Sequence, residues 1–67
     1  MSNEYYVIVD LENLTYMANG EATNLKGADK FDTLEEARNE LKEYDYDFNG
    51  AIYKVKEVKE IKIKKVY

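Results

Sequence analysis

Hydrophobic and polar positions along the chain predict a small α+β domain. The segment "EYYVIVD", residues 4–10, is rich in aromatic and β-branched residues and predicts a first strand. Both of its faces are apolar, which is typical of a central strand that is covered on both sides. A second strand is predicted at about 13–18, where apolar residues alternate before Asn19-Gly20. This dipeptide is a strong hairpin signal, and a weak third strand is predicted after it.

The segment "FDTLEEARNELKEY" predicts a helix over about residues 33–45. Thr33 and Glu36 have the spacing of a capping box at the start of a helix, and Asp32 is a rival cap. Apolar side chains then recur at spacings of three and four, which places them on one helix face. These residues are Leu34, Ala37, Leu41 and Tyr44.

The last sixteen residues, "IYKVKEVKEIKIKKVY", contain many valines and isoleucines and favour extended structure. The parity of the apolar positions changes between Val55 and Val58 and again before Ile61, which a straight strand cannot accommodate. Either one long strand bulges near 56–60, or two strands meet at a turn at Lys59-Glu60. Because this turn would lack glycine and asparagine, the pattern favours one long bent strand.

Together these elements predict a single domain over residues 1–67, with a small antiparallel sheet and one helix packed on one face. The expected order is ββαβ or ββαββ. Because one short helix covers only one face of the sheet, we expect the other face to be exposed and to form a two-fold homodimer. The residues predicted for this dimer face are Tyr6, Ile8, Val58, Ile61, Ile63 and Val66.

Composition argues against several classes of function. The chain has no cysteine and no histidine, which removes disulfides, imidazole or thiol catalysis and the usual ligands of structural zinc. We therefore predict no catalytic residues and expect that the protein is not an enzyme. The N-terminal segment has neither the basic start of a signal peptide nor the length of a membrane span. A cytoplasmic protein without membrane contact is the expectation.

Charge divides the chain into two parts. Residues 1–50 carry a net charge of −8 and residues 51–67 a net charge of +4. Acids on the polar face of the helix and just after it, together with Asp29 and Asp32, would form an acidic surface that attracts a basic partner by long-range steering. A merely solvated helix has the same pattern. The residues predicted for this partner-binding face are Glu36, Glu40, Glu43, Asp45 and Asp47.

Lysines of the C-terminal segment share one parity and could line one side of a strand. They are Lys54, Lys56, Lys62 and Lys64. A basic strand flanked by aromatic residues is one way to bind nucleic acid. The net charge of −4 and the absence of arginine from this segment argue against direct nucleic-acid binding, and pairing with acidic neighbours is the simpler interpretation.

The segment "DYDFNGAI" matches the first half of an EF-hand calcium loop, through Asp45, Asp47, Asn49 and Gly50. The match fails at the twelfth position, where Lys56 replaces the bidentate glutamate. A helix end followed by a turn, with Gly50 in a left-handed conformation, is the simpler interpretation. A weak calcium site is therefore an alternative, and no other cofactor is expected.

The stretch "ADKFDTLEEARNEL", followed by "GAIYKVKEV", resembles short proteins encoded by bacteriophages and prophages, over about residues 5–58. The resemblance implies that Ala28 and Phe31 lie under the sheet and that the helix starts at Thr33. It also implies a small accessory protein that binds and blocks a host enzyme of DNA repair, restriction or CRISPR defence.

Three functional hypotheses follow. The leading one is a phage-type inhibitor of a host defence or nucleic-acid-processing enzyme, anti-CRISPR-like or DNA-mimicking, acting in the host cytoplasm. The second is a protein that binds calcium or a small ligand through the Asp45–Gly50 loop. The third is an assembly module that pairs through its C-terminal strand.

Overall fold

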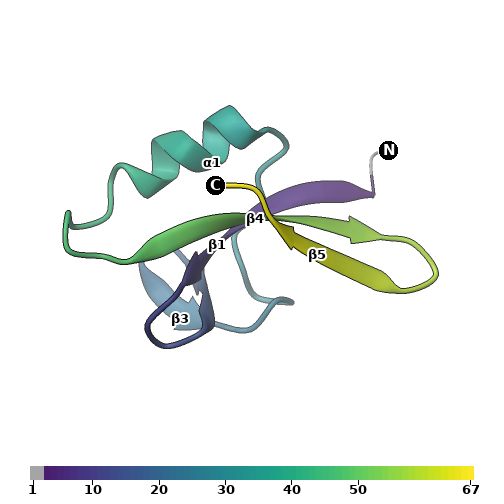
Figure 1. Cartoon of the computed structure of the whole chain (residues 1–67), viewed down its shortest axis with the longest axis horizontal. Coiled ribbons are helices and arrows are strands. Elements are labelled where there is room, and N and C mark those ends of the chain that lie inside the picture. Colours follow the sequence, from purple (N-terminus) through teal and green to yellow (C-terminus); the bar gives the residue numbers. More distant parts are fainter. Residues whose placement is uncertain (1–2) are drawn as a thin grey trace.

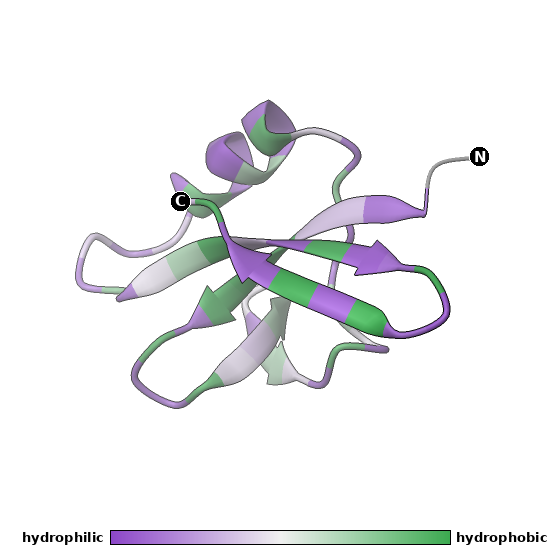
Figure 2. Ribbon diagram, turned by 45° about the vertical axis from the view of Figure 1, so that its right-hand side comes forward, coloured by the Kyte–Doolittle hydropathy of each residue, from purple (hydrophilic) through white to green (hydrophobic). Residues whose placement is uncertain are grey.

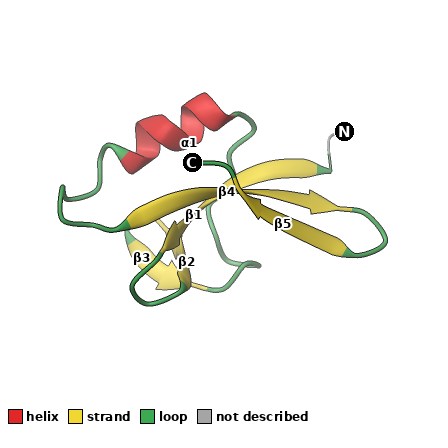
Figure 3. Ribbon diagram, viewed as in Figure 1, coloured by secondary structure: helices red, strands yellow, loops and turns green. Residues whose placement is uncertain are grey.

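A computed structural model describes residues 3–67 and shows a five-stranded antiparallel sheet with one helix on one face (Figure 1). The elements are β1 (Glu4–Asp10), β2 (Thr15–Ala18), β3 (Glu21–Thr23), α1 (Leu34–Leu41), β4 (Gly50–Glu57) and β5 (Ile61–Lys65). The strand order β3-β2-β1-β4-β5 places β1 at the centre. The predicted α+β class, with a small antiparallel sheet and one covering helix, is confirmed, and the weak third strand is present as β3 (Figure 3).

The hairpin of β2 and β3 is built on the predicted Asn-Gly turn. Ala18 lies opposite Glu21, so the turn has two central residues. Both have positive φ, 53° at Asn19 and 83° at Gly20. This combination defines a type I′ turn, whose twist matches that of the paired strands.

Helix α1 begins at the predicted capping box. The Thr33 hydroxyl accepts a hydrogen bond from the Glu36 N–H at 3.1 Å and donates to the Glu36 carboxylate at 3.1 Å. The helix is shorter than the predicted 33–45, because after Leu41 the chain tightens into turns with a hydrogen bond from the Tyr44 N–H to the Leu41 carbonyl. The Tyr44 ring still faces inward, where it stacks on Phe48 with 4.5 Å between ring centroids.

The helix covers the face of the sheet that carries Ile8 and Ile52, which are 1% and 0% exposed. Tyr6 packs against the same cluster. Placing Tyr6 and Ile8 on an open dimer face was therefore wrong. Because both faces of β1 are apolar, the alternation along the strand did not indicate which face the helix would cover.

A loop covers the centre of the opposite face. Val7 and Val55 are both 0% exposed there, and they form a cluster with Ala28, against which Leu25 packs. The prediction of a bare second face is therefore wrong for the centre of the sheet. Of the two residues that the resemblance placed under the sheet, Ala28 lies on this face and Phe31 on the helix side, where its N–H and C=O bond to Tyr6.

The C-terminal segment forms two strands rather than one long bent strand. Glu57 lies opposite Ile61, so three residues make the turn, and odd-numbered residues of both strands share one face. Val58 interrupts the parity because it lies in the turn, and it is 50% exposed. The parity change therefore marks a hairpin, even though the turn contains no glycine or asparagine.

This hairpin extends beyond the part of the sheet that the helix covers (Figure 1). All residues from 56 to 65 are exposed, and we call this segment the hairpin arm. The domain measures 36 Å along its longest axis, with a radius of gyration of 11.2 Å. Within residues 3–67, no helix has the length and apolar character needed to span a membrane.

Candidate functional site

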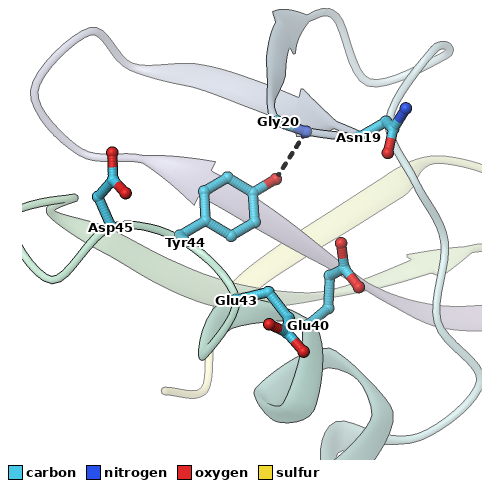
Figure 4. Close-up of a pocket in the computed structure, with 6 residues that line it drawn as sticks. All are labelled: Asn19, Gly20, Glu40, Glu43, Tyr44 and Asp45. Atoms are coloured by element: carbon cyan, nitrogen blue, oxygen red, sulfur yellow. Dashed lines mark hydrogen bonds between the residues drawn. The ribbon is translucent and has the colours of Figure 1, made fainter.

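Three glutamates follow each other at spacings of four and three, the first two on one flank of α1 and the third in the turn after Leu41. They are Glu36, Glu40 and Glu43, and we call them the acidic flank. Residues so spaced are neighbours on a helix surface, so their charges reinforce one another. Glu40 and Glu43 border a surface hollow of about 340 Å³ between the helix end and the β2–β3 turn (Figure 4). The structure thus brings together three of the five acids predicted for the partner-binding face.

Tyr44 forms the floor of this hollow and links the helix end to the β2–β3 turn. Its hydroxyl accepts a hydrogen bond from the Gly20 N–H at 3.3 Å (Figure 4). Burial raises the pKa of Tyr44, the hydrogen bond from Gly20 lowers it, and the negative charges of Glu40 and Asp29 raise it further. The ring thus lies in a negative field from two separate segments of the chain.

Asp29, one of two loop acids predicted to extend the acidic surface, lies in this acidic region. Its carboxylate accepts a hydrogen bond from the Asn19 N–H at 2.7 Å, which holds it beside the turn. Asn19 also lines the hollow bordered by Glu40 and Glu43, so this hydrogen bond places Asp29 near the acidic flank. No periodic pattern includes Asp29, because it belongs to an irregular loop.

The two remaining predicted acids lie differently. Asp45 lines the same hollow, whereas Asp47 is not among its lining residues. Asp47 belongs to a turn closed by a hydrogen bond from the Phe48 N–H to the Asp45 carbonyl at 2.9 Å. The acidic surface therefore ends near Asp45.

The other flank of α1 carries charges of both signs. The guanidinium of Arg38 lies over the ring of Tyr67, 4.8 Å from its centroid, and Lys42 follows one turn later. Both bases share a surface hollow with Glu35, so the side towards the end of the chain has a small excess of bases. A partner attracted by the acidic flank would meet repulsion on the Arg38 side.

The loop that resembles half of an EF-hand has a different conformation from the one expected. Gly50 opens β4 opposite Asp10, and positive φ values occur elsewhere among the described residues, at Leu14 and in the β2–β3 turn. The predicted left-handed Gly50 is therefore wrong. Glycine is needed for space instead, because a Cβ at this position would overlap the ring of Phe48.

The three residues proposed as calcium ligands, Asp45, Asp47 and Asn49, form no obvious cage. The Asn49 carbonyl accepts a hydrogen bond from the Leu11 N–H at 2.9 Å and thereby extends the β1–β4 pairing. In the described part of the chain, no three Asp or Glu side chains are grouped so that they could hold one metal ion. The geometry adds no support to the calcium hypothesis, which stays a prediction.

The four lysines of the C-terminal segment gather on one face of the β4–β5 hairpin, which we call the lysine face. Lys54 lies opposite Lys64, and Lys56 lies opposite Lys62. The Lys54 ammonium forms an ion pair with the Glu4 carboxylate at 3.6 Å. A surface hollow of about 360 Å³ is lined by Glu4, Lys54, Lys56, Lys62, Ile63 and Lys64.

The other residues predicted for a dimer face are exposed. Ile61 and Ile63 share a sheet face with Val55 and are 54% and 40% exposed, whereas Val58 lies in the turn and Val66 follows β5. Of the predicted dimer face, the exposed apolar residues that share one strand face are Ile61 and Ile63 on the hairpin arm. The homodimer stays a prediction that rests on this smaller surface.

Comparisons with protein-family models, with curated proteins and with solved structures found no match to this chain.

Proposed function

We propose that this protein is a non-enzymatic interaction protein that binds a basic surface on an enzyme acting on nucleic acid and blocks it. The acidic flank is the contact surface, with Asp29 and Asp45 at its margin. Enzymes that bind nucleic acid present basic grooves to the phosphate backbone, and a surface of one negative sign attracts such grooves. The resemblance to phage and prophage accessory proteins supports a host defence or repair enzyme as the partner class.

The observation that carries this proposal is the arrangement of like charges around Tyr44. Glu40, Glu43 and Asp45 line one hollow with Tyr44, and Glu40 and the loop residue Asp29 both raise the pKa of its hydroxyl. Like charges on one helix flank oppose helix formation by a few tenths of a kcal/mol per pair. Because this arrangement of charges lowers the stability of the fold, binding to a basic partner explains its presence more readily than a structural role does.

The test measures DNA cleavage by a restriction endonuclease, a CRISPR nuclease and a repair exonuclease in the presence of increasing amounts of the protein. The wild-type chain should inhibit at least one of them. The double substitution Glu40→Lys/Glu43→Lys should weaken this inhibition about tenfold or more, because it replaces attraction by repulsion.

The matched control is Glu12→Lys/Glu60→Lys, which changes the net charge equally at exposed positions away from the flank. This control should inhibit like the wild type. Inhibition of none of the three enzymes would contradict the proposed partner class. Full inhibition by the flank variant would contradict the proposed surface, and a gel-shift assay of the same DNA would detect inhibition that arises from binding DNA instead.

A further inference from the structure

The outer edge of β5 presents a row of backbone hydrogen-bonding groups. The Val66 N–H donates to the Ile52 carbonyl at 2.9 Å, so this pair is hydrogen-bonded. Bonded pairs recur at every second residue of an antiparallel ladder, so Lys64 and Lys62 also bond to β4. The residues whose N–H and C=O groups point away from β4 are therefore Ile61, Ile63 and Lys65.

No strand of the described chain covers this edge, because β5 ends the sheet order. The edge is five residues long and contains no proline. Proteins usually protect such edges with a bulge, a proline, a covering segment or charges. Here the protection consists of the lysines alone.

Hydrophobic and hydrophilic residues alternate along β5 (Figure 2), so its two faces differ in chemistry. Ile61 and Ile63 lie on one face and are about half exposed, beside a hollow of about 430 Å³ that Ile61 and Leu25 line. Lys62 and Lys64 lie on the other face, within the lysine face. A strand added to this edge would meet apolar and basic side chains in alternation.

The lysine face is electrostatically unfavourable for the isolated chain. Like charges directly opposite each other on paired strands destabilise a sheet. Glu4 lies opposite Lys56 on β1 and its carboxylate forms an ion pair with Lys54, so the four lysines of this face outnumber the acid that lines the same hollow. An acidic partner would relieve this repulsion.

A second copy of β5 would not relieve the repulsion among these lysines. Antiparallel pairing about Ile63 would set Lys62 of one copy opposite Lys64 of the other. The lysine faces of both copies would then merge into one surface of eight positive charges. Self-pairing at this edge is therefore opposed by the same charges that favour an acidic strand.

We propose that the outer edge of β5 binds an extended segment of another protein in which acidic and apolar residues alternate. The main chain of that segment would pair with the outward groups of Ile61, Ile63 and Lys65. Its acidic side chains would lie beside Lys62 and Lys64, and its apolar side chains beside the two isoleucines. This mode of binding is strand addition, in which backbone bonds give affinity and alternating side chains give specificity. The surface is separate from the acidic flank and does not depend on it.

The test uses two labelled synthetic peptides of identical composition and the full chain, with fluorescence anisotropy as the measurement. One peptide is capped Glu-Val-Glu-Val-Glu-Val-Glu, and the other has the same residues in the order Glu-Glu-Glu-Val-Val-Val-Glu. The alternating peptide should bind about tenfold or more tightly than its rearranged form, because only the alternating order satisfies both faces at once. Equal binding of the two peptides, or no binding at about 1 mM, would overturn the proposal.

Two substitutions at one position isolate the backbone contribution. Ile63→Ala removes the side chain and keeps the outward N–H, whereas Ile63→Pro removes both, and proline is tolerated at an edge whose N–H faces solvent. Ile63→Pro should bind the alternating peptide about fivefold or more weakly than Ile63→Ala. Equal binding by these two variants would overturn strand addition, provided that circular dichroism shows both to be folded.

A charge reversal keeps the proposal testable if the proline variant does not fold. Lys62→Glu/Lys64→Glu should lose the acidic peptide and gain binding to the Lys-Val-Lys-Val-Lys-Val-Lys peptide. An unchanged preference would overturn the proposal. Two other results would also overturn the proposal, because each indicates a different occupant of this edge. One is tighter binding of a single-stranded oligonucleotide than of the alternating peptide. The other is a wild-type dimer, seen in light scattering, that Ile63→Pro makes monomeric.

Discussion

Strand β4 belongs to two different environments along its length. Its first half lies in the body of the domain, where Ile52 is 0% exposed beneath the helix. Its second half enters the hairpin arm, where every residue from 56 to 65 is exposed although three of these ten residues are valine or isoleucine. The body is organised by burial on both faces of the sheet. The arm keeps strand geometry without burial and is held by its backbone pairing.

The largest expected effect is a difference in stability loss between the same substitution made in the body and in the arm. Ile52→Ala should lower the free energy of unfolding by about 2–4 kcal/mol, because it leaves a cavity in a close-packed core. Ile61→Ala makes the same chemical change in the arm, where the side chain is 54% exposed, and should change stability by less than about 0.5 kcal/mol. Urea denaturation of both variants provides the measurement. Similar losses for the two would show that the arm is buried in solution, as in a dimer.

The second prediction concerns the point where β4 begins. Gly50→Ala should lower stability by about 1–3 kcal/mol, because the added methyl group overlaps the ring of Phe48 and forces it to move. A double-mutant cycle with Phe48→Ala tests the mechanism. In the Phe48→Ala background the cost of Gly50→Ala should fall by more than half. If Gly50→Ala lowers stability equally in the Phe48→Ala background, glycine is needed at this position for its backbone conformation and not for contact with the Phe48 ring.

The sequence predicted the elements of the body better than their arrangement. The Asn19-Gly20 turn and the Thr33 cap follow local rules, and each is found as expected. The covered face could not be assigned from local patterns, because the residues at both parities of β1 are apolar. The loop that covers the second face contributes only Leu25 and Ala28, which have no periodic spacing to identify them.

The hairpin of the arm was not predicted, for a related reason. Its turn contains none of the residues that usually mark a hairpin, so the change in parity at Val58 was interpreted as a bulge. The candidate acidic surface was anticipated for the helix, since its three glutamates follow helical spacing. Asp29 was expected beside the helix acids from its charge, but its hydrogen bond to the Asn19 N–H is a tertiary contact that leaves no signal in a single sequence.

The third prediction addresses the charges of the arm. Lys62→Glu should raise the stability of the isolated chain by about 0.2–1 kcal/mol, because it replaces a repulsive cross-strand pair with Lys56 by an attractive one. Lys59→Glu changes the net charge equally but lies in the turn, and should have a smaller effect. The difference between the two variants should shrink at about 1 M salt, where exposed charges are screened. A loss of stability in Lys62→Glu at low salt would contradict the idea that the lysine face is costly.

The fourth and smallest effect concerns the junction of body and arm. The Tyr5 hydroxyl of β1 donates a hydrogen bond to the Glu57 carboxylate at 2.7 Å. The pKa of Tyr5 is raised from 10.0 to about 12. The largest cause is burial, followed by this hydrogen bond, the negative charge of Glu57 and a contribution from Tyr16. Because the folded-state pKa exceeds the unfolded one, the protonated hydroxyl stabilises the fold. That stability is complete below pH 10 and is lost as the pH rises towards 12.

Tyr5→Phe should therefore change little at neutral pH beyond the loss of one exposed hydrogen bond, and should flatten the decline in melting temperature between pH 10 and 12. Tyr53→Phe removes another tyrosine of the sheet and serves as the control, which should keep the decline of the wild type. Thermal melting followed by circular dichroism at half-unit pH steps measures both variants. If Tyr5→Phe declines as steeply as the wild type, the bond to Glu57 does not hold the arm to the body. The body and the arm would then be coupled through backbone pairing, of β1 with β4 and of β4 with β5.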